Sequence, residues 1–198
     1  MRSPVFLSAS IPDREPFVHY SDPMAIREAV LALVAVTVRE RPLVFGGHPA
    51  ISPLVEHAAR SLDAAHNVHI YQSAWFEDVI PPEARAFENF HWTPKGESKA
   101  ESLEIMRERM IGSAPFGAAF FIGGMEGIED ECRIFKRLHA GAPLFPVSST
   151  QGATRDLAER GEGPEDSTIR HRLANDKKYR ALFRQLLDMI PDTPPKKR

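Results

Sequence analysis

The 198-residue chain contains a single cysteine, Cys132. One thiol cannot form an internal disulfide, and this usage is typical of a reducing compartment. No apolar run approaches the ~18 residues that a membrane-spanning helix requires, and the N-terminus lacks the pattern of a secretory signal peptide. These absences predict a cytoplasmic protein without a membrane partner.

A strong charge of one sign is also absent, because the formal net charge is only −2. Nucleic-acid-binding domains usually carry a basic stripe, whereas the one dense basic run here is Lys196-Lys197-Arg198, directly after residues 194–195, which are both proline. This composition predicts a flexible tail at residues 192–198 and no nucleic-acid partner.

Several sequence motifs that indicate a particular enzyme chemistry are missing. The chain has no Walker A sequence, no GxSxG elbow and no full GxGxxG, which disfavours a P-loop NTPase, a hydrolase triad and a conventional NAD enzyme. Its eight histidines do not pair with carboxylates at metal-ligand spacing, and one cysteine cannot build a thiolate site. We therefore expect neither a metal ion nor a cofactor.

Short apolar runs alternate with amphipathic segments through residues 1–191, which we interpret as a single domain. The predicted strands cover residues 4–7, 42–45, 68–71, 87–92, 116–122 and 143–147, and the predicted helices cover residues 23–39, 54–62, 99–110, 127–140, 152–159 and 167–190. Asp22 and Ser52 have the character of N-caps because a proline follows each, and Gly141 that of a C′ glycine. The alternation predicts an α/β fold, with a parallel sheet of about six strands and helices on both faces.

Small and polar residues follow four of the predicted strands. In an open parallel sheet, ligands bind beyond the carboxyl ends of the strands, where small residues let a ligand approach the backbone and helix N-termini offer N–H groups to anions. Each residue also has a plain structural explanation: a tight turn for a Gly-Gly pair, an N-cap for serine or threonine, and an exposed turn for His48. The candidate ligand-binding residues are Ser8, Ser10, Gly46, Gly47, His48, Gly123, Gly124, Met125, Glu126, Gly127, Ser148, Ser149 and Thr150.

Glu131 is the candidate catalytic residue. It stands three residues after Ile128 and four before Phe135, and so falls on the apolar stripe of its predicted helix. A carboxylate in that position beside a strand-end crevice would be partly desolvated and its pKa raised, as for catalytic acids and bases. The alternative is a carboxylate at the rim of the stripe that reaches water.

These motifs together resemble the SLOG superfamily, which includes the Lonely Guy-type nucleotide phosphoribohydrolases and the Smf/DprA-like proteins. The likeness rests on the sequences FLSASIP at residues 6–12, FGGHP at residues 45–49 and IGGMEGIEDE at residues 122–131. It covers roughly residues 5–150 and is closest to SLOG subfamilies linked to prokaryotic conflict systems. The resemblance implies a Rossmann-like fold, a nucleotide-derived small molecule as ligand, and a homodimer.

The enzymes of that superfamily carry a Pro-Gly-Gly-x-Gly-Thr-x-x-Glu motif, whose turn holds a phosphate and whose Glu serves N-glycosidic cleavage. Gly123, Gly124 and Gly127 match its glycines, and Glu131 matches its Glu. Isoleucines stand in place of the Pro and the Thr, at positions 122 and 128, and one extra residue, Met125 or Glu126, lengthens the turn. For the second catalytic residue of these enzymes, an arginine, we consider Arg14.

Two functions follow from these residues and the resemblance. The first is a sensor-type domain that binds a nucleotide derivative in the strand-end crevice. The second is a nucleotide N-glycosidic hydrolase of the Lonely Guy phosphoribohydrolase type that uses Glu131. An interaction scaffold that retained the fold and lost the site is a third, weaker alternative.

Overall fold

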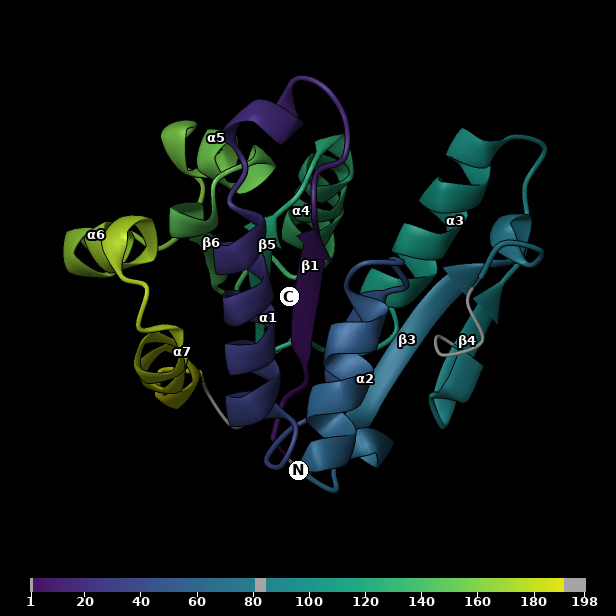
Figure 1. Cartoon of the computed structure of the whole chain (residues 1–198), viewed down its shortest axis with the longest axis horizontal. Coiled ribbons are helices and arrows are strands. Elements are labelled where there is room, and N and C mark those ends of the chain that lie inside the picture. Colours follow the sequence, from purple (N-terminus) through teal and green to yellow (C-terminus); the bar gives the residue numbers. More distant parts are fainter. Residues whose placement is uncertain (1, 81–84, 191–198) are drawn as a thin grey trace.

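The computed structural model describes residues 2–80 and 85–190 and has one parallel sheet of six strands (Figure 1). The strand order is β4-β3-β2-β1-β5-β6 and every pairing is parallel. The strands are β1 (Val5–Ser10), β2 (Leu43–Gly46), β3 (Val68–Ser73), β4 (Asn89–Thr93), β5 (Ala118–Gly123) and β6 (Leu144–Val147). The predicted α/β, Rossmann-like fold is therefore confirmed.

Seven α-helices of the described residues cover the two faces of this sheet. One face carries α1 (Pro23–Thr37), α2 (Ser52–Ser61), α6 (Ser167–Asn175) and α7 (Tyr179–Asp188). The other carries α3 (Lys99–Ile111), α4 (Glu126–Leu138) and α5 (Ala153–Glu159). No helix in residues 2–80 and 85–190 combines the length and the apolar character needed to cross a membrane.

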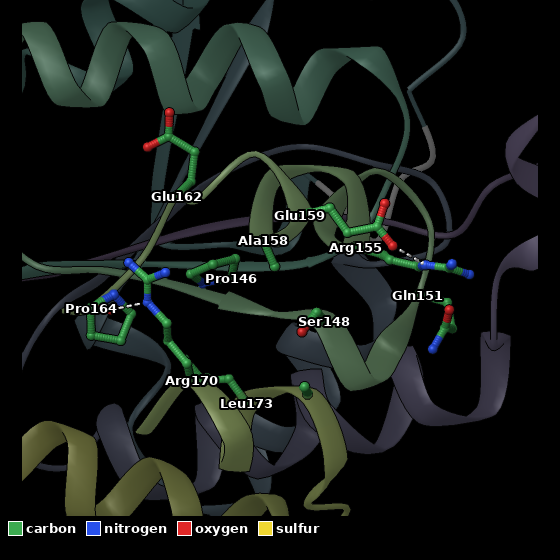
Figure 2. Close-up of a pocket in the computed structure, with 11 residues that line it drawn as sticks. Pro146, Ser148, Gln151, Arg155, Ala158, Glu159, Glu162, Pro164, Arg170 and Leu173 are labelled. Carbon is green, nitrogen blue, oxygen red and sulfur yellow. Dashed lines mark hydrogen bonds and ion pairs between the residues drawn. The ribbon is translucent and has the colours of Figure 1, made fainter. Parts of the chain in front are cut away.

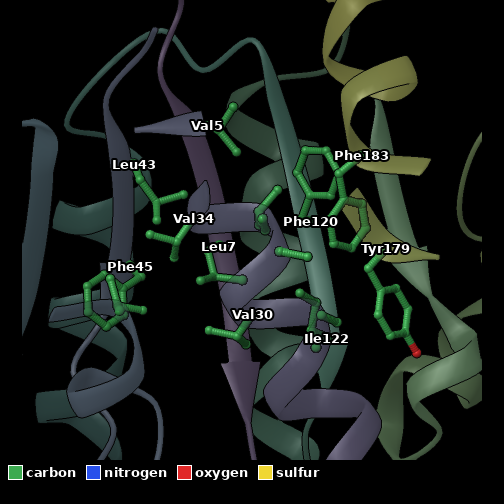
Figure 3. Packing of buried hydrophobic residues seen from close by; sticks show 14 of the residues in the cluster. Val5, Leu7, Val30, Val34, Leu43, Phe45, Phe120, Ile122, Tyr179 and Phe183 are labelled. Atoms are coloured by element: carbon green, nitrogen blue, oxygen red, sulfur yellow. The ribbon is translucent and has the colours of Figure 1, made fainter. Parts of the chain in front are cut away.

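Side chains of the inner strands alternate between two apolar cores. Val5 and Leu7 of β1 pack with α1 and α7 on one face, together with Phe120 and Phe183 (Figure 3). Phe6 points to the other face and stacks on the Phe135 ring of α4, with 5.8 Å between the ring centroids. Burial on both faces explains why these strands are continuous apolar runs.

The order of the strands reverses at β1. From β1 the chain proceeds through β2, β3 and β4 toward one edge, then returns to place β5 and β6 on the other side of β1. The crossovers leave a switch point between the carboxyl ends of β1 and β5, and open α/β sheets bind ligands at such a point. Ser10 and Gly123 are paired there.

Several predicted boundaries need correction. Strand β1 continues through Ser8 to Ser10 rather than ending at Leu7, because it stays paired with β5 as far as Gly123. Helix α2 begins at Ser52 itself, with Ile51 at the cap position, while the Ser52 hydroxyl accepts the N–H of His48 at 3.1 Å. The predicted N-cap of α1 is confirmed, since the Asp22 carboxylate accepts the N–H of Ala25 at 2.9 Å.

The C-terminal part differs more. Helix α4 ends at Leu138 and is capped by His139, so Gly141 is not its C′ residue. The long helix predicted for residues 167–190 is two helices, because the backbone turns extended at Asp176 and its carboxylate accepts the N–H of Lys178 at 2.8 Å. The predicted tail at residues 192–198, and the last residue of the predicted domain, lie outside the described residues.

Candidate functional site

One strand and two helices bring a serine, a carboxylate and a guanidinium together near the switch point. Ser8 lies in β1, Glu131 in α4 and Arg107 in α3. The Ser8 hydroxyl donates to one oxygen of Glu131 at 2.5 Å, and Arg107 Nε lies 3.7 Å from the other. Both charged side chains are 14% exposed. Glu131 is thus held inward and does not sit at a solvated rim.

Burial dominates the electrostatics of this cluster. Desolvation raises the pKa of the Glu131 carboxyl, while the Arg107 charge and the Ser8 hydrogen bond act in the opposite direction. Arg107 also donates to Asp130 at 2.8 Å. Among the described residues, Arg107 Nε is one of the few buried polar atoms without a hydrogen-bond partner, because its ion pair with Glu131 is 3.7 Å long.

Arg107 is the site residue that the sequence did not indicate. It stands in a charged helix with no motif, although Met106 and Met110 beside it are buried. Its guanidinium packs over the first turn of α4, where a Cβ on Gly127 would lie 2.8 Å from it. Glycine at position 127 therefore makes room for the arginine. The other arginine considered, Arg14, pairs with Glu126 at 2.8 Å and not with Glu131.

The turn at Gly123-Gly124 is closed by the protein itself. Gly123 donates to Thr150 at 2.8 Å and accepts from the Thr154 hydroxyl at 2.6 Å. Gly124 donates to the carbonyl of Ser10 at 2.9 Å and accepts the N–H of Ala153 at 3.0 Å. These four backbone groups bond to β1, to α5 and to Thr150 after β6, which leaves neither N–H of this pair for a phosphate.

The residues after β6 point in different directions. Thr150 Oγ donates to the Val147 carbonyl at 2.6 Å while it accepts from Gly123, and the Ser149 hydroxyl lies 3.4 Å from that of Tyr179. Ser148 lines a separate cavity of about 380 Å³ between α5 and α6 (Figure 2). The structure thus does not bring these three residues together with Glu131.

The charged side chains of that cavity have partners of their own. Arg155 donates to Glu159 at 2.7 Å, and Arg170 bonds the carbonyl of Pro164 (Figure 2). The Glu162 carboxylate, at the upper left of the view, accepts from Lys136 at 2.7 Å. Three of these four side chains are thus in ion pairs, while the Arg170 guanidinium bonds backbone carbonyls.

A second cavity, of about 260 Å³, opens beyond β2 and β3. His48 and Gln72 provide its larger polar side chains, and most of its wall is apolar. The eleven lining residues are Gly47, His48, Pro49, Ser52, Pro53, Gln72, Phe76, Val79, Ile80, Leu103 and Met106. We call it the His48 pocket.

The remaining predicted residues lie between these features. The Gly46 Cα faces Met106 and Met110, so that an added Cβ would lie 3.6 Å from the methyl of each. Met125 is the cap residue of α4, and its carbonyl accepts from Ile128. Glu126 is exposed, and its hydrogen bond from Arg14 lowers its pKa. Within residues 2–80 and 85–190, no group of three or more metal-ligating side chains is close enough to hold an ion.

Comparison with known proteins agrees with this architecture. A family model described as the SLOG cluster3 family matches residues 16–187. The chain is also similar to the X-ray structure of TM1055, a Northeast Structural Genomics Consortium target, with 16% identity, a TM-score of 0.52 and coverage of 87% of this chain and 89% of that one. At that identity the likeness concerns the fold alone. No curated protein matches the chain. Because the family model covers most of its length, the chain belongs to the SLOG cluster3 family.

Proposed function

We propose that this domain is a sensor-type binder of a nucleotide-derived small molecule, held in the crevice at the carboxyl ends of β1, β2 and β5. The observation that carries the proposal is the convergence of Ser8, Arg107 and Glu131 from three separate elements. Because desolvation of both charges is costly, a buried ion pair seldom adds to the stability of a fold. A buried carboxyl whose pKa is raised is therefore more typical of a functional site.

The chemistry of the cluster fits the sugar of such a ligand. A carboxylate accepts hydrogen bonds from a vicinal diol, and a guanidinium donor supplies the complementary contact. Arg107 Nε, which has no hydrogen-bond partner among the described residues and lies 3.7 Å from Glu131, is a donor of this kind. The short Ser8 bond fixes the orientation of the Glu131 carboxyl.

The closed Gly123-Gly124 turn favours binding over catalysis of the phosphoribohydrolase type. In place of glycine N–H groups, an anion would meet the exposed Arg14 and the first turn of α4. Arg14 already donates a hydrogen bond to the Glu126 carboxylate at 2.8 Å. A phosphate would therefore have to displace that carboxylate, which gives the ligand a way to move the loop after β1.

A second candidate, hydrolysis of an N-glycosidic bond, is favoured by the raised pKa of Glu131. In that reaction water adds its hydroxyl to C1′, the C1′–N bond breaks, and the departing base takes the proton. A raised pKa lets a carboxyl hold its proton to higher pH and donate it to the base. The same group, once ionised, can orient the water.

A panel of nucleoside monophosphates and dinucleotides distinguishes the two functions. We expect thermal stabilisation without release of free base from the wild type, and an affinity about 10- to 100-fold lower for Glu131→Gln, the value of a lost charge-assisted hydrogen bond. Glu129→Gln is the matched control, because Glu129 lies in the same helix and pairs outward with Arg160 at 2.9 Å. Base release abolished by Glu131→Gln would favour the hydrolase. No thermal shift with any nucleotide would refute both functions.

The resemblance supports two further proposals, a homodimer and a role in a prokaryotic conflict system, and the composition supports a cytoplasmic location. Light scattering coupled to size exclusion tests the dimer, which should elute with about twice the mass of the 22.2 kDa chain.

A further inference from the structure

The His48 pocket lies beyond β2, the strand that pairs with β1, and β1 carries Ser8. Ser8 and Gly46 are the next residues after Leu7 and Phe45, which are paired between β1 and β2. The Met106 side chain lies over Gly46 and also lines the pocket. A ligand that spans the neighbouring ends of β1 and β2 would therefore reach from the Ser8 side toward the pocket.

The pocket wall selects an apolar, uncharged group. Proline, leucine, isoleucine, valine, methionine and phenylalanine side chains make up most of it, and none of the described lining residues is Lys, Arg, Asp or Glu. The N-terminus of α2 offers little to an anion, because Leu54 and Val55 donate to the carbonyl of Ile51 and the proline of α2 has no N–H. A phosphate is excluded here for lack of a counter-charge.

Two polar side chains give the pocket a hydrogen-bonding edge. His48 Nδ1 accepts the N–H of Ala50 at 3.2 Å, which leaves Nε2 as the protonated nitrogen and donor. Burial lowers the His48 pKa, so the ring is neutral at pH 7. The Gln72 amide is held at Gly47, where its Nε2 lies 3.4 Å from the carbonyl oxygen, and its own oxygen is an acceptor.

We propose that the His48 pocket is the subsite for a neutral heteroaromatic ring, of the nucleobase or nicotinamide type, read along its edge by His48 and Gln72. The inference rests on the proposed function, since the Glu131 cluster would hold the adjoining sugar. Apolar walls with a few placed polar groups are the usual form of such a subsite.

Two substitutions change the pocket without touching Glu131. A Cβ at position 47 would lie 2.8 Å from Gln72 Nε2, so Gly47→Ala displaces the amide. His48→Phe keeps a ring of similar shape and removes the donor. His57→Phe is the matched control, because His57 is an exposed histidine of α2. Thermal unfolding without ligand verifies that each variant is folded.

Titration calorimetry with adenosine 5′-monophosphate, nicotinamide mononucleotide and ribose 5-phosphate tests the subsite. We expect at least one ring-bearing ligand to bind the wild type tenfold or more tightly than ribose 5-phosphate. Gly47→Ala and His48→Phe should abolish that preference and leave ribose 5-phosphate unchanged, while His57→Phe keeps it. Equal binding of ribose 5-phosphate and the nucleotides, or an unchanged preference in both pocket variants, would overturn the ring subsite and leave the nucleotide-binding proposal standing.

If no nucleotide binds the wild type, the proposed function fails, and free adenine and nicotinamide at millimolar concentration decide the subsite alone. Binding that disappears in His48→Phe would support it. Absence of binding, or binding that both pocket variants retain, would refute it.

Discussion

Replacement of Gly124 by alanine is expected to destabilise the domain through two separate effects. Gly124 has φ of +84°, and a Cβ there would lie 1.9 Å from the Cδ1 of Ile128 and 2.5 Å from its Cγ1. A left-handed conformation costs a residue with a Cβ about 1–2 kcal/mol, and overpacking adds about 1–3 kcal/mol. The free energy of unfolding should therefore fall by about 2–5 kcal/mol.

Gly161→Ala separates the two effects. Gly161 has nearly the same φ, +85°, and a Cβ there would meet nothing within 4 Å. Both variants share the cost of the left-handed backbone and the stabilisation that comes from a stiffer unfolded chain. The difference between their free energies of unfolding, about 1–3 kcal/mol, therefore measures the collision with Ile128. Urea unfolding gives each free energy by linear extrapolation. Equal losses in the two variants would refute the reasoning.

A double mutant checks the named partner. Ile128→Ala alone should cost about 2–5 kcal/mol, because Ile128 is buried in the core. Combined with Gly124→Ala it should cost less than the sum, since the missing side chain leaves room for the added methyl. A strictly additive double mutant would show that the methyl meets something other than Ile128.

Three further predictions concern buried polar groups. Thr150→Val removes the acceptor of the Gly123 N–H. The free energy of unfolding measured in urea should therefore fall by about 1–3 kcal/mol. A loss below about 0.5 kcal/mol would mean that another group replaces the hydroxyl. The raised pKa of Glu131 means that the folded state holds this proton more tightly than the unfolded chain. As the pH rises above the ordinary value of 4.5 toward the raised one, wild type should lose stability relative to Glu131→Gln, and a relative gain in urea titrations across that window would contradict the sign. Burial raises the pKa of Cys132 to about 11, so at pH 8 only about one thiol in a thousand is ionised. An aromatic disulfide reagent should therefore react with Cys132 far more slowly in the native protein than in urea. Similar rates would place the thiol at the surface.

Hydrophobic patterning was enough to predict the sheet. The residues of β5 are buried on both faces, which is why the sequence there is one apolar run, and each crossover helix carries its own stripe. The Asp22 cap was equally local, because an N-cap needs only its own side chain and the N–H three residues on. Neither of these features depends on distant partners.

The boundaries that failed depended on hydrogen bonds that hydrophobic patterning does not report. A serine after an apolar run resembles a turn, yet Ser8 remains in β1 because the backbone stays paired with Phe121 of β5. The helices at residues 167–190 share a continuous pattern, and the break at Asp176 comes from one carboxylate that takes up the N–H of Lys178. Periodicity does not report such hydrogen bonds.

The residues of the candidate site also fall into those that the sequence indicated and those that only the structure brought together. By itself, the sequence determined that Glu131 lies on an apolar stripe and that small residues end β1, β2 and β5, because both properties follow from local periodicity and strand direction. Only the tertiary structure decided that Arg107 meets Glu131, that the Gly123-Gly124 turn is closed by Thr150 and Thr154, and that His48 faces a separate apolar pocket. The physical reason is that these side chains meet through packing between elements, and the choice of partner is set by which helix lies beside which strand.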